Sequence, residues 1–186
     1  MNPMSREVPT EFSTKRLYIR MPRPGDGTAV YEAIKESIVD LKPWLGFAHD
    51  EQSEQKAEEH IREAVIRYRE CEDLRLLVFL KDTGELVASS GLHRIDWNVP
   101  KFEIGYWIRS SKSGQGFMTE AVEGITQMAM QELGARRVEI RCDSNNQKSR
   151  RIPERLGFTL EGILRNDAVT ADGTSLRDTC IYAKIQ

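Results

Sequence analysis

The segment with the clearest chemical pattern is the polar turn over residues 110–116, which carries two glycines one residue apart, Gly114 and Gly116. Alternating apolar residues precede this turn, as in a β-strand, and apolar residues at helical spacing follow it. The first N–H groups of a helix have no partner within the helix, and they lie at the positive end of its dipole. Because glycines let an anion approach the backbone closely, the pattern predicts a pyrophosphate-binding turn.

The glycine spacing excludes two common nucleotide-binding motifs. A dinucleotide fingerprint needs a third glycine where the chain has Thr119, and a P-loop needs a Lys-Ser or Lys-Thr pair after the second glycine. Two glycines alone are also compatible with a flexible turn that binds nothing. A second segment is therefore needed to identify the ligand.

That second segment, residues 146–149, opens a predicted short helix that ends at a Leu-Gly-Phe sequence. Together with the turn, it resembles the GNAT family of N-acetyltransferases, and most closely the RimJ/RimL branch, which acetylates protein N-termini. Four motifs of that branch occur in the right order, and the likeness spans most of the chain. They are Ile-Gly-Tyr-Trp at 104–107, the glycine turn and helix start at 114–121, Asn-x-x-Ser at 146–149, and Leu-Gly-Phe-x-x-Glu-Gly at 156–162.

The resemblance implies that acetyl-coenzyme A is the cosubstrate and that no metal takes part. The turn amides would bind its pyrophosphate, and backbone groups near residues 107–109 would pair with its pantetheine arm like an added strand. The residues implied in cofactor binding are Trp107, Ile108, Arg109, Ser111, Lys112, Ser113, Gly114, Gln115, Gly116, Phe117, Met118, Thr119, Asn146 and Ser149.

Composition limits the class of protein. The 186 residues suit one domain with a sizeable core, and 27 basic against 29 acidic residues leave no footprint for nucleic acid. Cys71, Cys142 and Cys180 are scattered and include no Cys-x-x-Cys pair, which predicts reduced thiols in a cytoplasmic protein rather than disulfides or zinc. Residues 1–12 lack the apolar core of a signal peptide, and no apolar run is long enough to span a membrane.

The order of the predicted elements, β-α-α-β-β-β-α-β-α-β-β, indicates an α+β fold of mixed α/β type. We expect a flexible N-terminus over residues 1–13 and a single domain over residues 14–186. The sheet should be central and mostly antiparallel, with about seven strands and helices on both faces. The resemblance implies that the fourth and fifth of these strands, at 101–109 and 138–142, splay apart around the pantetheine arm.

Acetyl transfer needs a base that takes a proton from the acceptor amine. The first candidate is Glu103, which alternation places on the strand face opposite Phe102 and Ile104. The second is His93, which would neighbour Glu103 if the two strands pair around the turn at 97–100. Histidine titrates in the useful pH range. Exposed or ion-paired strand residues would give the same pattern, so both assignments stay open.

The departing thiolate needs a proton or a hydrogen-bond donor. Many members of the family place a tyrosine seven residues after the motif asparagine, but here Asn146 is followed by Pro153 at that position. In the RimL-like branch the serine three residues after the asparagine is thought to serve, which implies Ser149. A proline inside a helix offers no N–H to the carbonyl four residues earlier, so we expect a bend just after Ser149. Alternatively, Ser149 bonds only its own helix, with Asn146 as an ordinary cap.

The acceptor is the least specified part of the site. In acetyltransferases of this type the region between the first two helices often lines the acceptor site, so Trp44 and Phe47 are candidate contacts unless they merely cover the core. We predict direct attack by a protein N-terminal amine, as in ribosomal proteins, without an acyl-enzyme on Cys142. The alternatives are a small amine (a polyamine, an amino acid or an antibiotic) and a coenzyme A-binding sensor without turnover. A homodimer is compatible with the resemblance, because this branch is often dimeric.

Overall fold

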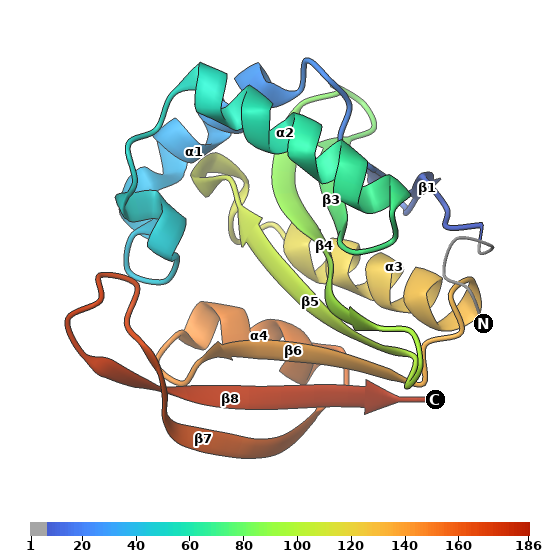
Figure 1. The fold of residues 1–186 in the computed structure, drawn as a ribbon, viewed down its shortest axis with the longest axis vertical. Coiled ribbons are helices and arrows are strands. Elements are labelled where there is room, and N and C mark those ends of the chain that lie inside the picture. Colours follow the sequence, from blue (N-terminus) through green and yellow to red (C-terminus); the bar gives the residue numbers. More distant parts are fainter. Residues whose placement is uncertain (1–6) are drawn as a thin grey trace.

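The computed structural model describes residues 7–186, which form one sheet of eight strands with helices on both faces (Figure 1). The strands lie in the order β1-β2-β3-β4-β5-β6-β8-β7. They are β1 (Glu11–Ser13), β2 (Leu17–Arg20), β3 (Leu74–Leu80), β4 (Leu86–Asp96), β5 (Lys101–Ile108), β6 (Arg137–Asp143), β7 (Thr159–Val169) and β8 (Leu176–Ile185). The helices are α1 (Gly27–Leu41), α2 (Glu54–Arg69), α3 (Phe117–Gln131) and α4 (Gln147–Arg155), with the 3-10 turns η2 (Gly46–His49) and η3 (Ser110–Lys112).

Alternation along the strands divides the core between the two faces of the sheet. Phe102 and Ile104 of β5 are buried in the larger cluster, which α3 and α4 cover. Leu77 and Phe79 of β3 point the other way and pack under α1 and α2. Helices therefore cover both faces, as the sequence predicts. Within residues 7–186 no helix is long and apolar enough to cross a membrane.

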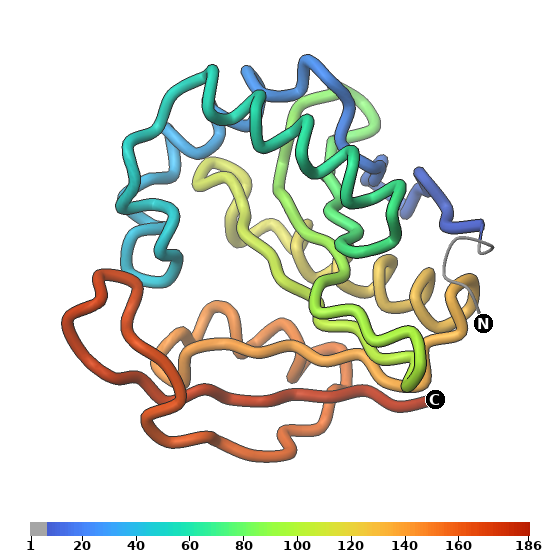
Figure 2. Tube along the Cα trace, viewed as in Figure 1, coloured from blue at the N-terminus to red at the C-terminus, as the bar shows by residue number. Residues whose placement is uncertain are grey.

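The two central strands, β5 and β6, are parallel and pair over only three residues. The pairs are Lys101 with Arg137, Phe102 with Val138, and Glu103 with Glu139. Beyond Glu103 the strands diverge, while β5 stays paired with β4 and β6 stays paired with β8. Figure 2 shows the two chain traces separating from this end onward. The predicted splay between these strands is confirmed, and all other neighbouring strands are antiparallel.

The N-terminal segment contains a short strand that the sequence did not predict. Residues 1–6 lie outside the described part of the chain, but Glu11–Ser13 form β1, which pairs with β2 and makes the sheet eight strands rather than about seven. Phe12 packs against the main core, and the Tyr68 hydroxyl donates to the Pro9 carbonyl at 2.6 Å. The sequence did not predict β1, because a three-residue strand is too short to show alternation.

Candidate active site

The turn between β5 and α3 leaves backbone N–H groups free. Gly114 and Gly116 adopt left-handed conformations, with φ angles of 76° and 79°, and Gly116 is the N-cap of α3. The backbone N–H groups of residues 116–119 have no acceptor within residues 7–186. The positive end of the α3 dipole lies at the same place. The turn therefore has the geometry that a pyrophosphate needs.

The first half of this turn is held by α1. Glu36 accepts a hydrogen bond from the backbone N–H of Ser111 at 2.9 Å, and Ser37 accepts one from that of Ser110 at 2.8 Å. Arg109 donates to Glu36 at 2.5 Å. The hydrogen bond from the Ser111 side chain, together with the Ser111 amide and Arg109, outweighs desolvation and lowers the pKa of Glu36 to about 2. An ionised carboxylate thus fixes the start of the turn.

Two of the cationic side chains predicted to bind the cofactor, Arg109 and Lys112, already form ion pairs within the protein. Arg109 and Lys112 form ion pairs with Glu85, at 3.3 Å and 2.6 Å, next to the turn between β3 and β4. These ion pairs hold the turn that follows β5 in place. They also mean that Arg109 and Lys112 already have a carboxylate partner, Glu85. The role of Ser111, Lys112 and Ser113 in cofactor binding stays a prediction.

Arg16 is a cation at the turn that the sequence analysis did not single out. Its guanidinium donates to the Gln115 carbonyl at 3.0 Å and to Glu120 at 2.6 Å, and it lies 4.4 Å from the centre of the Phe117 ring. The side chain is 42% exposed, so it can still meet an anion bound at the α3 N-terminus. No local pattern could have placed it there, because Arg16 and the turn are about a hundred residues apart along the chain.

A hydroxyl pair joins β5 to α4 on the face that α3 and α4 cover. The Ser149 hydroxyl donates to the Tyr106 oxygen at 3.1 Å, and the Tyr106 hydroxyl donates to the Ser149 carbonyl at 2.9 Å. That carbonyl needs an outside donor because Pro153, inside α4, has no N–H to offer it. Asn146 caps α4 by accepting from the Ser149 amide at 3.1 Å. The sequence analysis missed Tyr106, although it identified the gap that Tyr106 fills.

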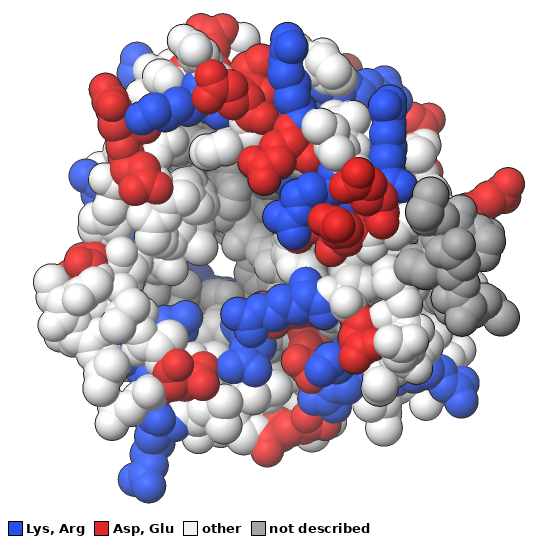
Figure 3. Space-filling model, in the orientation of Figure 1, with Lys and Arg blue, Asp and Glu red and all other residues white. Residues whose placement is uncertain are grey.

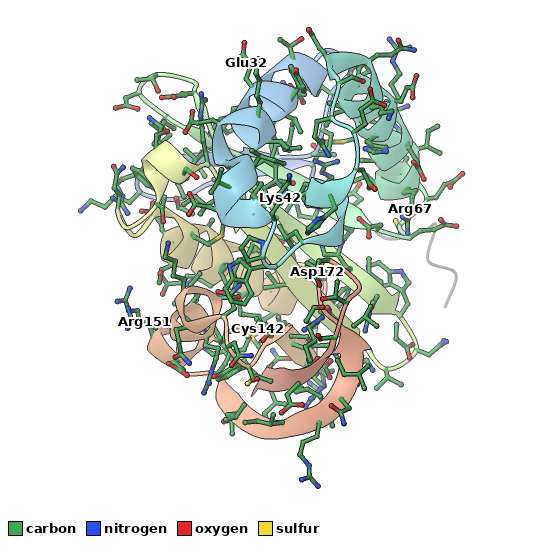
Figure 4. All side chains as sticks on the ribbon, turned by 90° about the vertical axis from the view of Figure 1, so that its left-hand side faces the viewer. Glu32, Lys42, Arg67, Cys142, Arg151 and Asp172 are labelled. Carbon is green, nitrogen blue, oxygen red and sulfur yellow. The ribbon has the colours of Figure 1, made fainter. Side chains whose placement is uncertain are left out.

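Tyr106 and Cys142 both lie near Ser149 but remain neutral. Burial, partly offset by the hydrogen bond with Ser149, raises the pKa of Tyr106, so the phenol is a hydrogen-bond donor at neutral pH. Burial also raises the pKa of Cys142 to about 11. A thiol that stays protonated is a poor nucleophile, which argues against an acyl-enzyme on Cys142. Figure 4 shows Cys142 inside the lower layer of the molecule, while Arg151 of α4 points outward.

The two predicted bases are neighbours on the opposite face of the sheet. His93 and Glu103 are directly paired across β4 and β5, which confirms the predicted register. His93 Nδ1 lies 2.8 Å from Asp73 Oδ2, so we assign the proton to Nδ1 and leave Nε2 as a proton acceptor. Desolvation raises the pKa of Glu103, although Arg94, 3.6 Å away, opposes the shift. The sequence analysis did not identify Asp73, which orients the imidazole.

The divergence of β5 and β6 lies between these two sets of groups. Successive residues of a strand point to opposite faces, so Glu103 and Tyr106 project from β5 on opposite sides of the sheet. A thioester held where the strands separate would have a base on one side and the hydroxyl pair on the other. Figure 3 shows the molecule hollowed at its centre, between the part formed by α1 and α2 and the part formed by β6 to β8.

Two aromatic residues predicted to contact the acceptor lie at the rim of this region. The Phe47 ring centre is 6.5 Å from that of Trp107, and Trp44 is 39% exposed. A side-chain atom placed on Gly46 would lie 3.9 Å from the Ala171 carbonyl of the β7–β8 turn. Figure 4 shows this turn, which carries Asp172, rising toward the end of α1 near Lys42. Both aromatics are therefore accessible, and their contact with substrate stays a prediction.

Comparison with known proteins identifies relatives over most of the chain. Residues 16–159 match the family model of the acetyltransferase (GNAT) domain. A Bacillus subtilis protein provisionally named as the ribosomal N-acetyltransferase YdaF is 34% identical over 82% of each chain, and the Escherichia coli ribosomal-protein-serine acetyltransferase is 28% identical over 84% of this chain and 85% of its own. A solved structure of RimL with coenzyme A superposes with a TM-score of 0.85 at 21% identity, covering 96% of this chain and 97% of its own, which shows the shared fold.

We expect Glu36→Gln to lower stability in a pH-dependent way. The lowered pKa means that the carboxylate stabilises the fold above its ordinary pKa of 4.5 and loses this contribution as the pH falls toward about 2. The difference in Tm between the wild type and Glu36→Gln should therefore be largest near neutral pH and shrink below about pH 4.5. Thermal unfolding from pH 3 to pH 7 measures it. Glu32→Gln, on the outer side of α1 (Figure 4), is the matched control, and an equal shift in both variants would contradict the assignment.

We also expect Tyr106→Phe to lower the free energy of unfolding by about 1–3 kcal/mol, because it leaves the Ser149 carbonyl without a donor. Pro153→Ala, added to Tyr106→Phe, supplies a helical N–H to that carbonyl and should recover part of the loss. Chemical denaturation of the two single variants and the double variant measures the coupling. Additive effects of the two changes would show that Pro153 is not the reason why the carbonyl needs Tyr106.

Proposed function

The chain belongs to the GNAT family of acetyltransferases, and we propose that it transfers the acetyl group of acetyl-coenzyme A to the N-terminal amine of a protein. The observation that carries this proposal is the divergence of β5 and β6 between a base on one face and a hydroxyl donor on the other. Two relatives named as ribosomal acetyltransferases, from Bacillus subtilis and Escherichia coli, favour a protein acceptor. Solved relatives hold coenzyme A or acetyl-coenzyme A, which favours the same cosubstrate here.

The cosubstrate supplies the activated acetyl group, and this chain supplies the groups that hold it. The free amides of residues 116–119 would bind the pyrophosphate, and Arg16, although paired with Glu120, is exposed enough to add a hydrogen bond from its guanidinium. The edge of β5 beyond Glu103 no longer pairs with β6, so its backbone groups are available to an extended amide chain. These donors belong to rigid elements, which lowers the entropic cost of orienting the thioester.

His93 is the base that the contacts favour. A base that is itself oriented by a third group is typical of proton transfer sites, and Asp73 orients His93 in this way. The Nε2 atom would take a proton from the acceptor ammonium, and the neutral amine would then form the N–C bond. Glu103, beside His93, would attract the cationic acceptor before it loses that proton. The first preference of the sequence analysis, Glu103 as the base, remains the alternative.

Ser149 is the donor that we assign to the leaving group. As the C–S bond breaks, the nitrogen loses its second proton to become an amide, and that proton balances the charge on the departing thiolate. A hydroxyl within reach stabilises the thiolate by donating a hydrogen bond. Tyr106 holds the Ser149 hydroxyl at 3.1 Å, and the asparagine cap fixes the first turn of α4. The serine would therefore turn from Tyr106 toward the sulfur without moving the backbone.

A small amine is the second candidate acceptor. The β7–β8 turn comes close to η2, which narrows one end of the region next to Trp107 and favours a small substrate. A thiol-release assay with acetyl-coenzyme A separates the candidates when N-terminal peptides, polyamines and aminoglycosides are compared as acceptors. Coenzyme A binding without turnover of any amine would instead identify a sensor.

We expect His93→Gln to lower kcat by about a hundredfold or more, because general-base catalysis contributes about that much. Asp73→Asn should lower kcat less, since it disturbs the orientation of the imidazole and leaves the ring in place. Glu103→Gln should mainly raise the KM for the acceptor. Steady-state kinetics with the best peptide measure all three effects. A large kcat loss in Glu103→Gln, with His93→Gln close to wild type, would reassign the base to Glu103.

Loss of the Ser149 hydroxyl should act in the transition state. Ser149→Ala is expected to lower kcat and kcat/KM together by about tenfold or more, while the affinity for acetyl-coenzyme A stays near wild type. The defect should shrink with a thioester whose thiol is more acidic, because that leaving group needs less help. Single-turnover kinetics isolate the chemical step. Full single-turnover rates in Ser149→Ala would restrict this serine to capping α4.

A further inference from the structure

Arg75, a cation on the sheet, has no counter-ion in the part of the chain that the structure describes. Arg75 lies on β3, and within residues 7–186 no carboxylate comes within ion-pair distance of its guanidinium. Its Nε donates to the neutral Ser89 hydroxyl at 3.1 Å. Burial lowers the pKa of Arg75, although the more distant charges of Asp73 and Asp26 oppose that shift. An arginine stays charged in proteins, so this charge is held with little local compensation.

The two carboxylates that act on the pKa of Arg75, Asp26 and Asp73, already accept hydrogen bonds from other side chains. Asp26 uses both of its oxygens to accept from Arg20, each at 2.7 Å. Asp73 accepts from His93 at 2.8 Å and lies 3.9 Å from Arg67. Neither carboxylate lies within ion-pair distance of Arg75. Among residues 7–186 the guanidinium therefore keeps unused donors in a partly buried position.

Gly91 and Gly105 leave the sheet surface beside Arg75 free of side chains. Its Cα is paired with Gly91 across β3 and β4, and Gly91 is paired in turn with Gly105 of β5. A side chain on Gly91 would come within 2.5 Å of the Leu74 carbonyl, and its φ of 151° also disfavours other residues. Because no side chain rises from Gly91, Arg75 can extend over β4 toward Ser89. Among residues 7–186 no fully buried side-chain nitrogen lacks a partner, so the terminal nitrogens of Arg75 retain contact with solvent.

The same glycines lie next to the proposed base. A side-chain atom on Gly105 would lie 3.4 Å from His93 Nε2, so the imidazole leans over this strand. His93, Gly91 and Ser89 are alternate residues on one face of β4, and Arg75 bonds the last of them. Neighbours in this series are spaced by about 7 Å along a strand, so Ser89 lies about 14 Å from His93 along β4. The imidazole leans over Gly105, however, which pairs with Gly91, one step from Ser89. An anion bound by Arg75 beside Ser89 would therefore lie roughly 7 Å from an amine held at His93 Nε2.

We propose that Arg75 binds a carboxylate of the acceptor, and that good acceptors carry this group about 7 Å from the reacting amine. This inference rests on the proposed acetyl transfer and narrows its substrate class. In a protein N-terminus, an aspartate or glutamate at the second residue places its carboxylate at about that distance. In a free amino acid, the α-carboxylate lies closer to the amine and fits the spacing less well.

The experiment compares amidated peptides that begin Ser-Asp or Ser-Asn, with free serine and serine amide as a second pair. Thiol release should give a kcat/KM about tenfold or more higher for Ser-Asp than for Ser-Asn in the wild type. Arg75→Gln should bring the two peptides within about twofold of each other, mainly by lowering the value for Ser-Asp. If the kcat/KM ratio of free serine to serine amide exceeds that of Ser-Asp to Ser-Asn, the carboxylate that Arg75 binds is the α-carboxylate instead. Equal kcat/KM values within both pairs in the wild type would overturn the proposal.

Two controls keep the result interpretable. Arg62→Gln removes an exposed cation from α2 and should leave the preference intact, which separates Arg75 from a general charge effect. Arg75→Met keeps the apolar stem in case Arg75→Gln does not fold, as judged by thermal unfolding. If no amine is acetylated, the proposed function fails, and calorimetry with N-acetylated Ser-Asp and Ser-Asn peptides in the presence of coenzyme A still tests Arg75. A Ser-Asp preference that survives in both Arg75 variants would also overturn the proposal.

Discussion

The organisation of this protein depends on the brief pairing of its two central parallel strands. β5 and β6 share three residue pairs and then separate, while each remains paired on its other side. An unpaired strand edge inside a protein is costly unless something satisfies its backbone groups. We propose that an extended ligand satisfies this edge, between the candidate bases His93 and Glu103 on one face and the Tyr106–Ser149 hydroxyl pair on the other.

Much of this arrangement could be read from periodicity. The alternation of Phe102, Ile104 and Tyr106 with Glu103 fixes which side chains face α3, and the turn at 97–100 sets the pairing of His93 with Glu103. Local glycine chemistry likewise located the start of α3. The resemblance to a known family supplied the separation of the central strands, which no local pattern encodes.

The contacts that could not be predicted all join segments far apart in the chain. Arg16 meets the glycine turn from the segment between β1 and β2, Tyr106 meets α4 from β5, and Asp73 meets His93 from the loop before β3. Each depends on tertiary packing rather than on spacing. Pro153 is instructive in this respect, because the sequence showed that a carbonyl would lack a donor without showing which residue would supply one. β1 was missed for a different reason, since three residues carry too little alternation to be recognised.

The short pairing between β5 and β6 also affects how independently the two parts of the sheet can open. It is the seam between a subsheet of β1 to β5 and a subsheet of β6, β8 and β7, and few backbone hydrogen bonds cross it. Regions joined by so few bonds can open as separate cooperative units, so the amides of the smaller subsheet need not share the exchange protection of the larger one. A ligand whose amides hydrogen-bond to the strands on both sides of this junction would link the two subsheets. The sheet would then be more rigid when the ligand is bound than when it is absent.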